Sequence, residues 1–160
     1  ALLGEVGQGF RIAMGTIDMA RTGLGAIGVG LARGAFDAAL AYAGDREQGG
    51  QAVGEYQAVQ LLVAEMDADL HGARGLVYDS AAAIAAGEGD TRLSSRAKWV
   101  ASEAADSVAR NAVQVFGGKG YRKGNPVERI YRDAKILSII GGTTEIQQTT
   151  VAKQALGLGR

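Results

Sequence analysis

The sequence predicts an all-α fold, an up-down four-helix-bundle-type domain with an extra short helix. The 160 residues are 47% hydrophobic and include only one proline, a composition that favours helix. Apolar residues recur at helical spacing over three long segments. No strand pattern of useful length, linker or internal repeat is visible. We therefore expect residues 1–160 to form a single helical domain.

The first long helix is expected from Phe10 to about Asp45. Its predicted buried stripe consists of apolar residues at three- to five-residue steps: Ile12, Ile17, Leu24, Ile27, Leu31, Phe36 and Leu40. The segment contains a literal GxGxxG, but no strand precedes it, so it is not a dinucleotide fingerprint. We expect its glycines to allow close helix packing: Gly23, Gly25, Gly28, Gly30 and Gly34. Arginines interrupt the segment on both sides, which makes it too short to span a membrane.

Four more helices are expected in order. The second spans about 55–86, the third about 91–115, a short fourth about 126–138, and the last about 144–155. The second and third each carry an apolar stripe. For the fourth, Asn125 is expected to cap the helix, Pro126 to occupy the first turn and Glu128 to reach back. For the last, Thr144 and Gln147 fit a capping box.

Composition excludes several functions. Lys plus Arg equals Asp plus Glu, at 17 each, so no net field favours nucleic acid. The chain has no cysteine and a single histidine, His71, which excludes thiolate and HExxH metal sites. No secretory signal opens the chain. Because it begins with Ala1 and reads as mid-chain sequence, we expect a fragment of a longer protein.

Six short segments carry a resemblance to a known family. Their order and spacing resemble the C-terminal helical domain of the acyl-CoA dehydrogenases over essentially the whole chain, and they lie at 46–50, 56–58, 114–121, 126–129, 132–136 and 142–147. The resemblance implies a fragment of a larger three-domain flavoprotein. The N-terminal helical domain and the middle β-domain of the family would lie outside these residues.

What the resemblance implies is FAD-dependent oxidation of acyl-CoA thioesters in fatty acid metabolism. In the family, FAD lies between subunits of a dimer or a dimer of dimers (a homotetramer). An electron-transfer flavoprotein is a further partner that the resemblance implies. It also implies a soluble protein of the bacterial cytoplasm or of an organelle matrix, without a membrane span and without nucleic acid.

The resemblance also assigns site residues. The expected FAD-binding residues are Arg46, Glu47, Gln48, Tyr56, Gln57, Gln114, Val115, Phe116, Gly117, Gly118, Thr143, Thr144 and Glu145. The expected acyl-CoA-binding residues are Asp18, Arg21 and Gly142. A guanidinium such as that of Arg46 suits a pyrophosphate. The alternatives are that Arg46 only satisfies a helix C-terminus, and that Asp18 and Arg21 form an ordinary surface pair.

The chain departs from the family at the catalytic base. Dehydrogenation needs a carboxylate that removes the α-proton of the thioester, and the two positions that carry it in the family are Gly141 and Ala20 here. Glu145 matches an FAD-side position and is not expected to replace the base. A second departure is Gly49, where the family usually has Phe beside the adenine.

Three explanations for the missing base remain open. The protein performs other acyl-CoA chemistry, such as desulfination of a sulfinoacyl-CoA. It is a base-free subunit of a heteromer. Or Gly141 is an engineered substitution, or the base comes from another domain. A non-enzymatic helical interaction domain is the remaining alternative.

Overall fold

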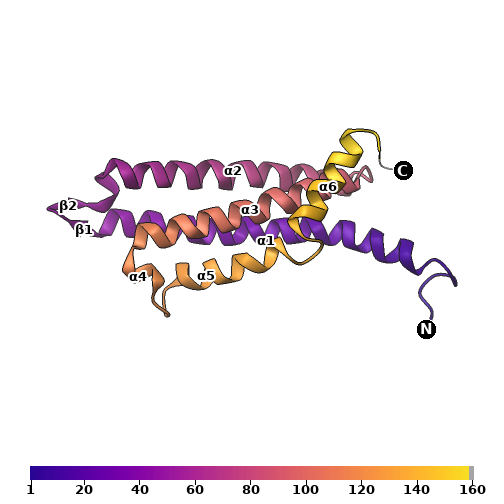
Figure 1. Ribbon diagram of the computed structural model, residues 1–160, viewed down its shortest axis with the longest axis horizontal. Helices are drawn as coiled ribbons and strands as arrows, with labels where there is room; N and C mark the ends of the chain where they lie inside the picture. The colour runs from indigo at the N-terminus through magenta and orange to yellow at the C-terminus, as the bar shows by residue number, and fades with distance from the viewer. Residues whose placement is uncertain (159–160) are drawn as a thin grey trace.

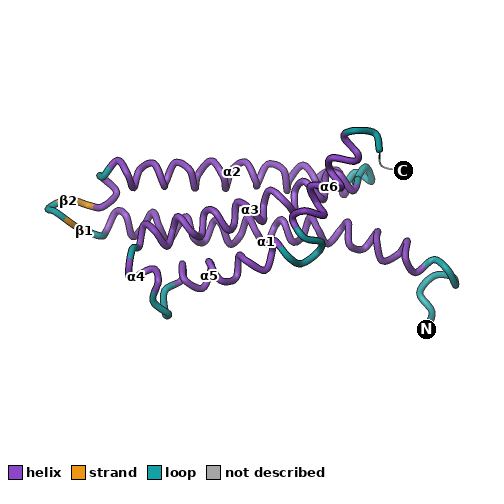
Figure 2. Tube along the Cα trace, in the orientation of Figure 1, coloured by secondary structure: helices purple, strands orange, loops and turns teal. Residues whose placement is uncertain are grey.

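The computed structural model of the protein describes residues 1–158 and confirms the all-α prediction (Figures 1 and 2). Three long helices form the bundle: α1 (Gly9–Asp45), α2 (Gln57–Ala85) and α3 (Thr91–Phe116). The shorter helices are α4 (Gly118–Tyr121), α5 (Pro126–Lys135) and α6 (Thr144–Ala155), with 3₁₀ turns at η1 (Val53–Glu55) and η2 (Ile136–Ser138). A two-residue antiparallel pair, β1 (Glu47–Gln48) and β2 (Gln51–Ala52), joins α1 to α2.

Helix α3 is the centre of the bundle because it packs against α1, α2, α4, α5 and α6. The stripes predicted for α2 and α3 are confirmed: Met66, Leu70, Ala73 and Val77 of α2, and Ala97, Val108 and Ala112 of α3, are buried. His71 lies on the exposed surface of α2, with Nδ1 2.9 Å from the carbonyl oxygen of Asp67.

The stripe predicted for α1 is largely wrong. Only Phe36 of the seven predicted residues is buried, whereas Ile17, Ile27 and Leu40 are exposed. The face that enters the bundle consists instead of small and polar residues: Arg21, Thr22, Gly25, Gly28, Ala32, Ala35, Ala39 and Ala43. Small side chains on this face let α1 come close to α3, and the large side chains therefore project outward.

Two of the five glycines of α1 make the expected close approach. A Cβ at Gly28 would lie 2.7 Å from the carbonyl oxygen of Ala101, and one at Gly25 would lie 3.3 Å from that of Ala97. Gly34 has only an ordinary contact with a side chain of α5, and Gly23 and Gly30 face open space. The prediction of close packing thus holds at Gly25 and Gly28.

The prediction that the first segment is too short to span a membrane is wrong on length. Helix α1 has 37 residues and is long and apolar enough to cross a membrane by length and composition alone. This is weak evidence for a span, because the core helix of a globular bundle passes the same test. In this fold α1 packs on α2, α3 and α5 and carries the buried Arg21.

Two predicted helix caps are not formed. Asn125 makes no capping bond to α5, because its amide donates to the carbonyl of Lys119, and Glu128 pairs with Arg132 instead of reaching back. Pro126 does occupy the first turn. Helix α6 has Thr143 rather than Thr144 at its N-cap, and no side chain caps it. Gln147 is buried and points away to the preceding turn.

The close approach of α1 to α3 gives a testable pair of substitutions. Gly28→Ala should lower the free energy of unfolding by about 1–3 kcal/mol, because the new Cβ forces the two backbones apart. Gly30→Ala is the matched control in the same helix, and it should raise the free energy of unfolding by about 0.5–1 kcal/mol. Urea denaturation measures both. Equal effects of the two substitutions would contradict the packing described here.

Candidate functional site

A turn between η2 and α6 is held by three side chains that converge on two carbonyl oxygens. Arg21 Nε donates to the carbonyl of Gly141 at 3.3 Å, and Lys98 Nζ donates to the carbonyl of Gly142 at 2.8 Å. Gln147 Nε2 donates to both, at 3.0 and 3.1 Å. The donors come from α1, α3 and α6, so three helices fix one turn.

Arg21 is the link between this turn and the surface of α1. Its side chain is 5% exposed and forms an ion pair with Asp18 at 2.6 Å. It also donates to the hydroxyl of Ser95 at 3.3 Å, and the other carboxylate oxygen of Asp18 accepts from Thr91 at 2.7 Å. The pair is therefore built into the protein, and the alternative of an ordinary surface pair does not describe it.

Lys98 is completely buried, and no carboxylate of residues 1–158 forms an ion pair with it. Burial lowers the pKa of the Lys98 ammonium from its usual value of 10.5, and the neighbouring Arg21 lowers it further. Glu103 and Glu145 act weakly in the opposite direction. A buried cation normally requires a partner, and here the carbonyl of Gly142 accepts the hydrogen bond.

The outward side of the turn carries free backbone donors. Gly141 and Gly142 have φ of 67° and 96°, which glycine adopts readily. Among the described residues, no acceptor is found for the N–H groups of Gly142 and Thr143. Beside them, the side chain of Thr143 and the backbone N–H of Glu145 lower the pKa of the Glu145 carboxyl. Thr144 donates to Glu103 at 3.1 Å.

A second site lies at the opposite end of the bundle, where the β1–β2 hairpin meets the end of α3 (Figure 1). A cavity of about 520 Å³ opens there. It is lined by Tyr42, Arg46, Gln48, Val53, Tyr56, Val59, Gln114, Val115, Phe116, Gly117, Gly118 and Lys119. We call this the hairpin cavity. It brings together eight of the thirteen residues that the sequence predicted for FAD.

Aromatic rings and cations share the hairpin cavity. The rings of Tyr42 and Phe116 stack with centroids 4.1 Å apart, and the ammonium of Lys119 lies 5.8 Å from the Tyr42 ring. Tyr56 donates its hydroxyl to the carbonyl of Gln48 at 2.8 Å. A Cβ at Gly49 would lie 2.6 Å from the Tyr56 hydroxyl, so Tyr56 occupies the space beside this glycine.

The remaining predicted residues fall outside both sites or at their edges. Glu47 and Gln57 are exposed and do not line the hairpin cavity. Ala20 is exposed on α1 although its neighbour Arg21 is buried. Asp18 borders a further cavity of about 490 Å³, which Met19, Ile84 and Thr91 also line.

The sequence analysis did not identify Lys98, Tyr42 or Lys119 as site residues. It also did not foresee that Gln147 donates hydrogen bonds to the turn. Lys98 had a visible signal, since it is a lone cation between small residues on the apolar side of α3. Lys119 lies in the 114–121 segment that carries the family resemblance, so its position was within reach. Tyr42 gave no signal, because an aromatic residue near a helix end is ordinary.

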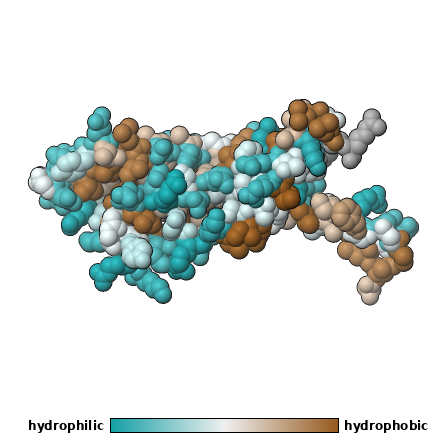
Figure 3. Space-filling view, viewed as in Figure 1, coloured by the Kyte–Doolittle hydropathy of each residue, from teal (hydrophilic) through white to brown (hydrophobic). Residues whose placement is uncertain are grey.

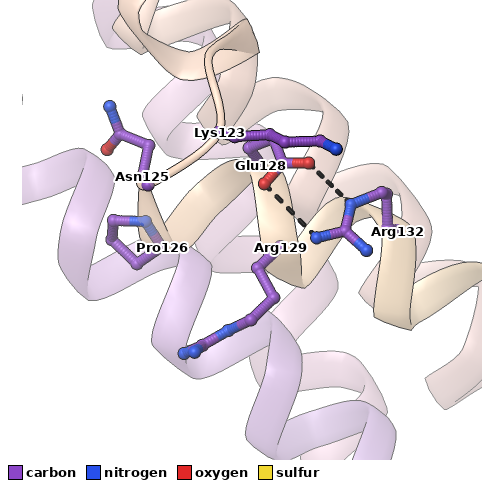
Figure 4. A pocket seen from close by; sticks show the side chains of 7 residues that line it. Lys123, Asn125, Pro126, Glu128, Arg129 and Arg132 are labelled. Atoms are coloured by element: carbon purple, nitrogen blue, oxygen red, sulfur yellow. Dashed lines mark hydrogen bonds and ion pairs between the residues drawn. The ribbon is translucent and has the colours of Figure 1, made fainter.

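A further cavity of about 620 Å³ lies elsewhere, at the start of α5 (Figure 4). Figure 4 shows Arg132 directed at Glu128, which accepts at 2.6 Å, with Lys123 and Arg129 nearby. This pair lowers the pKa of Glu128. No group of three or more potential metal ligands occurs within residues 1–158.

Comparison with known proteins decides the family. Residues 7–156 match the family described as acyl-CoA dehydrogenase, C-terminal domain. The chain belongs to the acyl-CoA dehydrogenase family. The resemblance drawn from the six short segments is thereby confirmed, and these residues form the C-terminal helical domain of that family.

Individual relatives agree. The chain is 42% identical over 155 residues to cyclohexane-1-carbonyl-CoA dehydrogenase of Geobacter metallireducens, covering 97% of this chain and 41% of that protein. It is 39% identical over 154 residues to the caffeyl-CoA reductase-Etf complex subunit CarC of Acetobacterium woodii, covering 96% and 41%. The structure of butyryl-CoA dehydrogenase from Megasphaera elsdenii superposes with a TM-score of 0.94 at 40% identity, covering 96% and 40%. The chain thus spans about two fifths of the length of these relatives.

The buried Lys98 gives this domain a specific pH dependence. Because the pKa of Lys98 is lowered by folding, the unfolded chain binds more protons just below pH 10.5, and the free energy of unfolding rises with pH there. In Lys98→Met this contribution is lost. Urea denaturation between neutral pH and 10.5 measures the free energy of unfolding of both proteins. As pH rises, the free energy of unfolding of the wild type should increase relative to that of Lys98→Met. A difference independent of pH would contradict a lowered pKa.

Proposed function

We propose that this chain is the C-terminal domain of a longer, three-domain flavoprotein that binds FAD and acts on acyl-CoA thioesters. The observation that carries the proposal is the hairpin cavity. It gathers a guanidinium, an ammonium and three aromatic rings, and eight of its lining residues are ones that the family resemblance assigned to FAD.

The residues of the hairpin cavity fit that group chemically. Arg46 and Lys119 offer positive charge to a pyrophosphate, and a guanidinium can bind phosphate oxygens with two parallel hydrogen bonds. Tyr42, Phe116 and Tyr56 offer ring faces to an adenine. Gly117 has φ of 60° and no side chain, so a ligand can approach the backbone there.

The turn at the other end of the bundle fits a second part of such a ligand. The N–H groups of Gly142 and Thr143, which have no acceptor within residues 1–158, can donate to oxygen atoms. They precede the N-terminus of α6, where partial positive charge favours electron-rich groups. In this proposal Thr143, Thr144 and Glu145 hold FAD within the subunit. When bound, FAD would accept a hydride from the β-carbon of the thioester.

The position of the two sites supports a homo-oligomer. They lie at opposite ends of the bundle: on α3, Lys98 and Gln114 are about 24 Å apart at 1.5 Å per residue. We infer that each subunit contributes the hairpin cavity to one FAD and the turn to another. A two-fold axis between identical chains satisfies this, as in a dimer or a dimer of dimers.

Exposed apolar side chains near the turn support contact with further protein or ligand. Ile136, Ile139, Ile140 and Ile146 are each at least 38% exposed and lie on either side of the turn. In Figure 3 hydrophobic surface gathers at this end of the molecule. Such a cluster on a globular domain marks an interaction surface.

Asp18 and Arg21 are proposed to line the acyl-CoA channel. Their ion pair joins the turn to the cavity of about 490 Å³ that Met19 and Ile84 also line. Within the pair Arg21 keeps the Gly141 carbonyl directed inward, and Asp18 presents its partly exposed carboxylate to the cavity. The chain thus positions and orients the substrate at this end.

The reaction itself is proposed less narrowly than the ligand. No carboxylate occupies position 141 or 20, and Leu24 fills the space beside Gly141: a Cβ there would collide with Leu24 Cδ1. The proposed reaction is α,β-dehydrogenation with a base from another domain. Acyl-CoA chemistry without α-proton abstraction, such as desulfination, is the alternative. It is favoured by the glycine at position 141 and by Leu24, which occupies the space that a side chain there would need.

An electron-transfer flavoprotein is the proposed redox partner. The support comes from the relative named as a subunit of a caffeyl-CoA reductase-Etf complex. Anaerobic titration of the full-length protein with acyl-CoA thioesters tests the function. Bleaching of the flavin absorbance indicates dehydrogenation, and bound FAD that stays oxidised indicates the alternative chemistry. A protein that binds neither FAD nor acyl-CoA would refute the proposal in favour of a helical interaction domain.

Arg46→Ala should reduce retention of FAD by the full-length protein, because the pyrophosphate loses a charged partner. A hydrogen bond between charged groups contributes about 1.5–3 kcal/mol, so the FAD dissociation constant should rise about tenfold or more. Arg33→Ala is the control, since Arg33 is exposed, pairs with Asp37 and does not line the hairpin cavity. Flavin content after gel filtration measures both. Equal retention in the two variants would exclude Arg46 from the site.

Gly141→Glu should raise α-proton abstraction if the base alone is missing. The structure adds a condition, since residue 141 has a positive φ and faces Leu24. A left-handed conformation costs a non-glycine residue about 1–2 kcal/mol. We therefore expect a larger gain in flavin bleaching by acyl-CoA for Gly141→Glu combined with Leu24→Ala than for either change alone. Background activity in the double variant, with FAD bound, would show that more than the base is absent.

A further inference from the structure

Lys98 has no role in the family resemblance, yet it is the largest fully buried side chain among residues 1–158. Its ammonium reaches across from α3 and donates to the carbonyl of Gly142 at 2.8 Å. Burying a cation is unfavourable unless it forms strong interactions. A hydrophobic residue of the same length would pack here at lower cost, so the charge calls for an explanation beyond packing.

The geometry of the turn supplies one. In a trans peptide the N–H of one residue points opposite to the carbonyl of the residue before it, and no cis peptide occurs within residues 1–158. Lys98 draws the Gly142 carbonyl into the bundle, and Arg21 and Gln147 draw in that of Gly141. The N–H groups of Thr143 and Gly142 are therefore turned outward.

The side chain of Gln147 places a hydrogen-bond donor on the inner side of the turn. Its Nε2 serves both carbonyls, while its buried Oε1 has no partner among the described residues. Turning the amide over would face oxygen against two carbonyls. Arg21 and Lys98 are the other donors. The two cations and the Gln147 amide all donate to the carbonyl oxygens of Gly141 and Gly142, and each of these bonds holds a carbonyl inward.

We propose that Lys98 is a positioning residue for the turn between η2 and α6. Lys98 holds the Gly142 carbonyl inward, so that the N–H of Thr143 is presented outward to an acceptor oxygen of the bound ligand. The charge has a second effect. An ammonium on the carbonyl polarises the Gly142–Thr143 peptide, which makes its N–H a better donor, because hydrogen bonds in a chain strengthen one another. The lowered pKa of Lys98 agrees with a desolvated group whose main partner is neutral.

This inference rests on the proposed function, and the test separates the two. The full-length protein is prepared as wild type, as Lys98→Met and as the control Ser80→Ala. Ser80 is also buried, and its hydroxyl pairs with Thr22 at 2.8 Å without touching the turn. Two quantities are measured: deuterium uptake of a peptide covering 139–147, and the FAD dissociation constant. Wild type that binds no FAD refutes the proposed function.

The expected result is specific to the turn. In Lys98→Met, exchange of the 139–147 peptide should accelerate about tenfold and the FAD dissociation constant should rise by about the same factor, the loss expected for one charge-assisted hydrogen bond. Ser80→Ala should leave both near wild type. Lys98→Leu, which also lacks a donor, makes the same comparison if the methionine variant does not fold. Unchanged exchange and FAD affinity in a folded Lys98 variant, or equal effects of Ser80→Ala, would overturn the proposal.

Discussion

The close packing of α1 on α3 is the constraint on which the rest of the structure depends. Gly25 and Gly28 bring the α1 backbone against the carbonyls of Ala97 and Ala101, where a side chain has no room. One turn before Gly25 on α1 lies Arg21, and Lys98 lies in the contacted stretch of α3. The same contact therefore brings two cations to one turn, and a wider separation of the helices would leave the Gly141 and Gly142 carbonyls without their donors.

The two ends of the bundle are linked through these helices. Helix α1 carries Arg21 toward one end and leads into Arg46 at the other, and α3 runs from Lys98 to Gln114 and Phe116. Rigid helices thus place the turn and the hairpin cavity at a fixed separation. A ligand shared between subunits requires such fixed geometry, and sites on packed helices provide it better than sites on loops.

Apolar periodicity predicted most of the helices. It gave the wrong buried face for α1, because large apolar side chains were taken as the buried ones. The bounds of α2, α3 and α6 followed from apolar spacing and glycine breaks. On α1 the large residues, such as Ile27 and Leu40, marked the outward face, because the contact with α3 requires small residues. The motifs of the hairpin cavity were found from order and spacing. Lys98 was visible as a cation among small residues, but the carbonyl that it holds appears only when α3 and the turn are placed together. Tyr42 gains its stacking partner Phe116 only when α1 meets the end of α3.

The missing carboxylate is a feature of the turn as a whole. Gly141 has a left-handed conformation and Leu24 occupies the adjacent space, while the carbonyl of Gly141 is fixed by Arg21 and Gln147. Retention of the cofactor-side contacts without the base is the central claim of this account. Its most direct test is titration of the full-length apoprotein with FAD, followed by flavin fluorescence. The account predicts saturation at one FAD per chain, and an absence of saturable binding would contradict it.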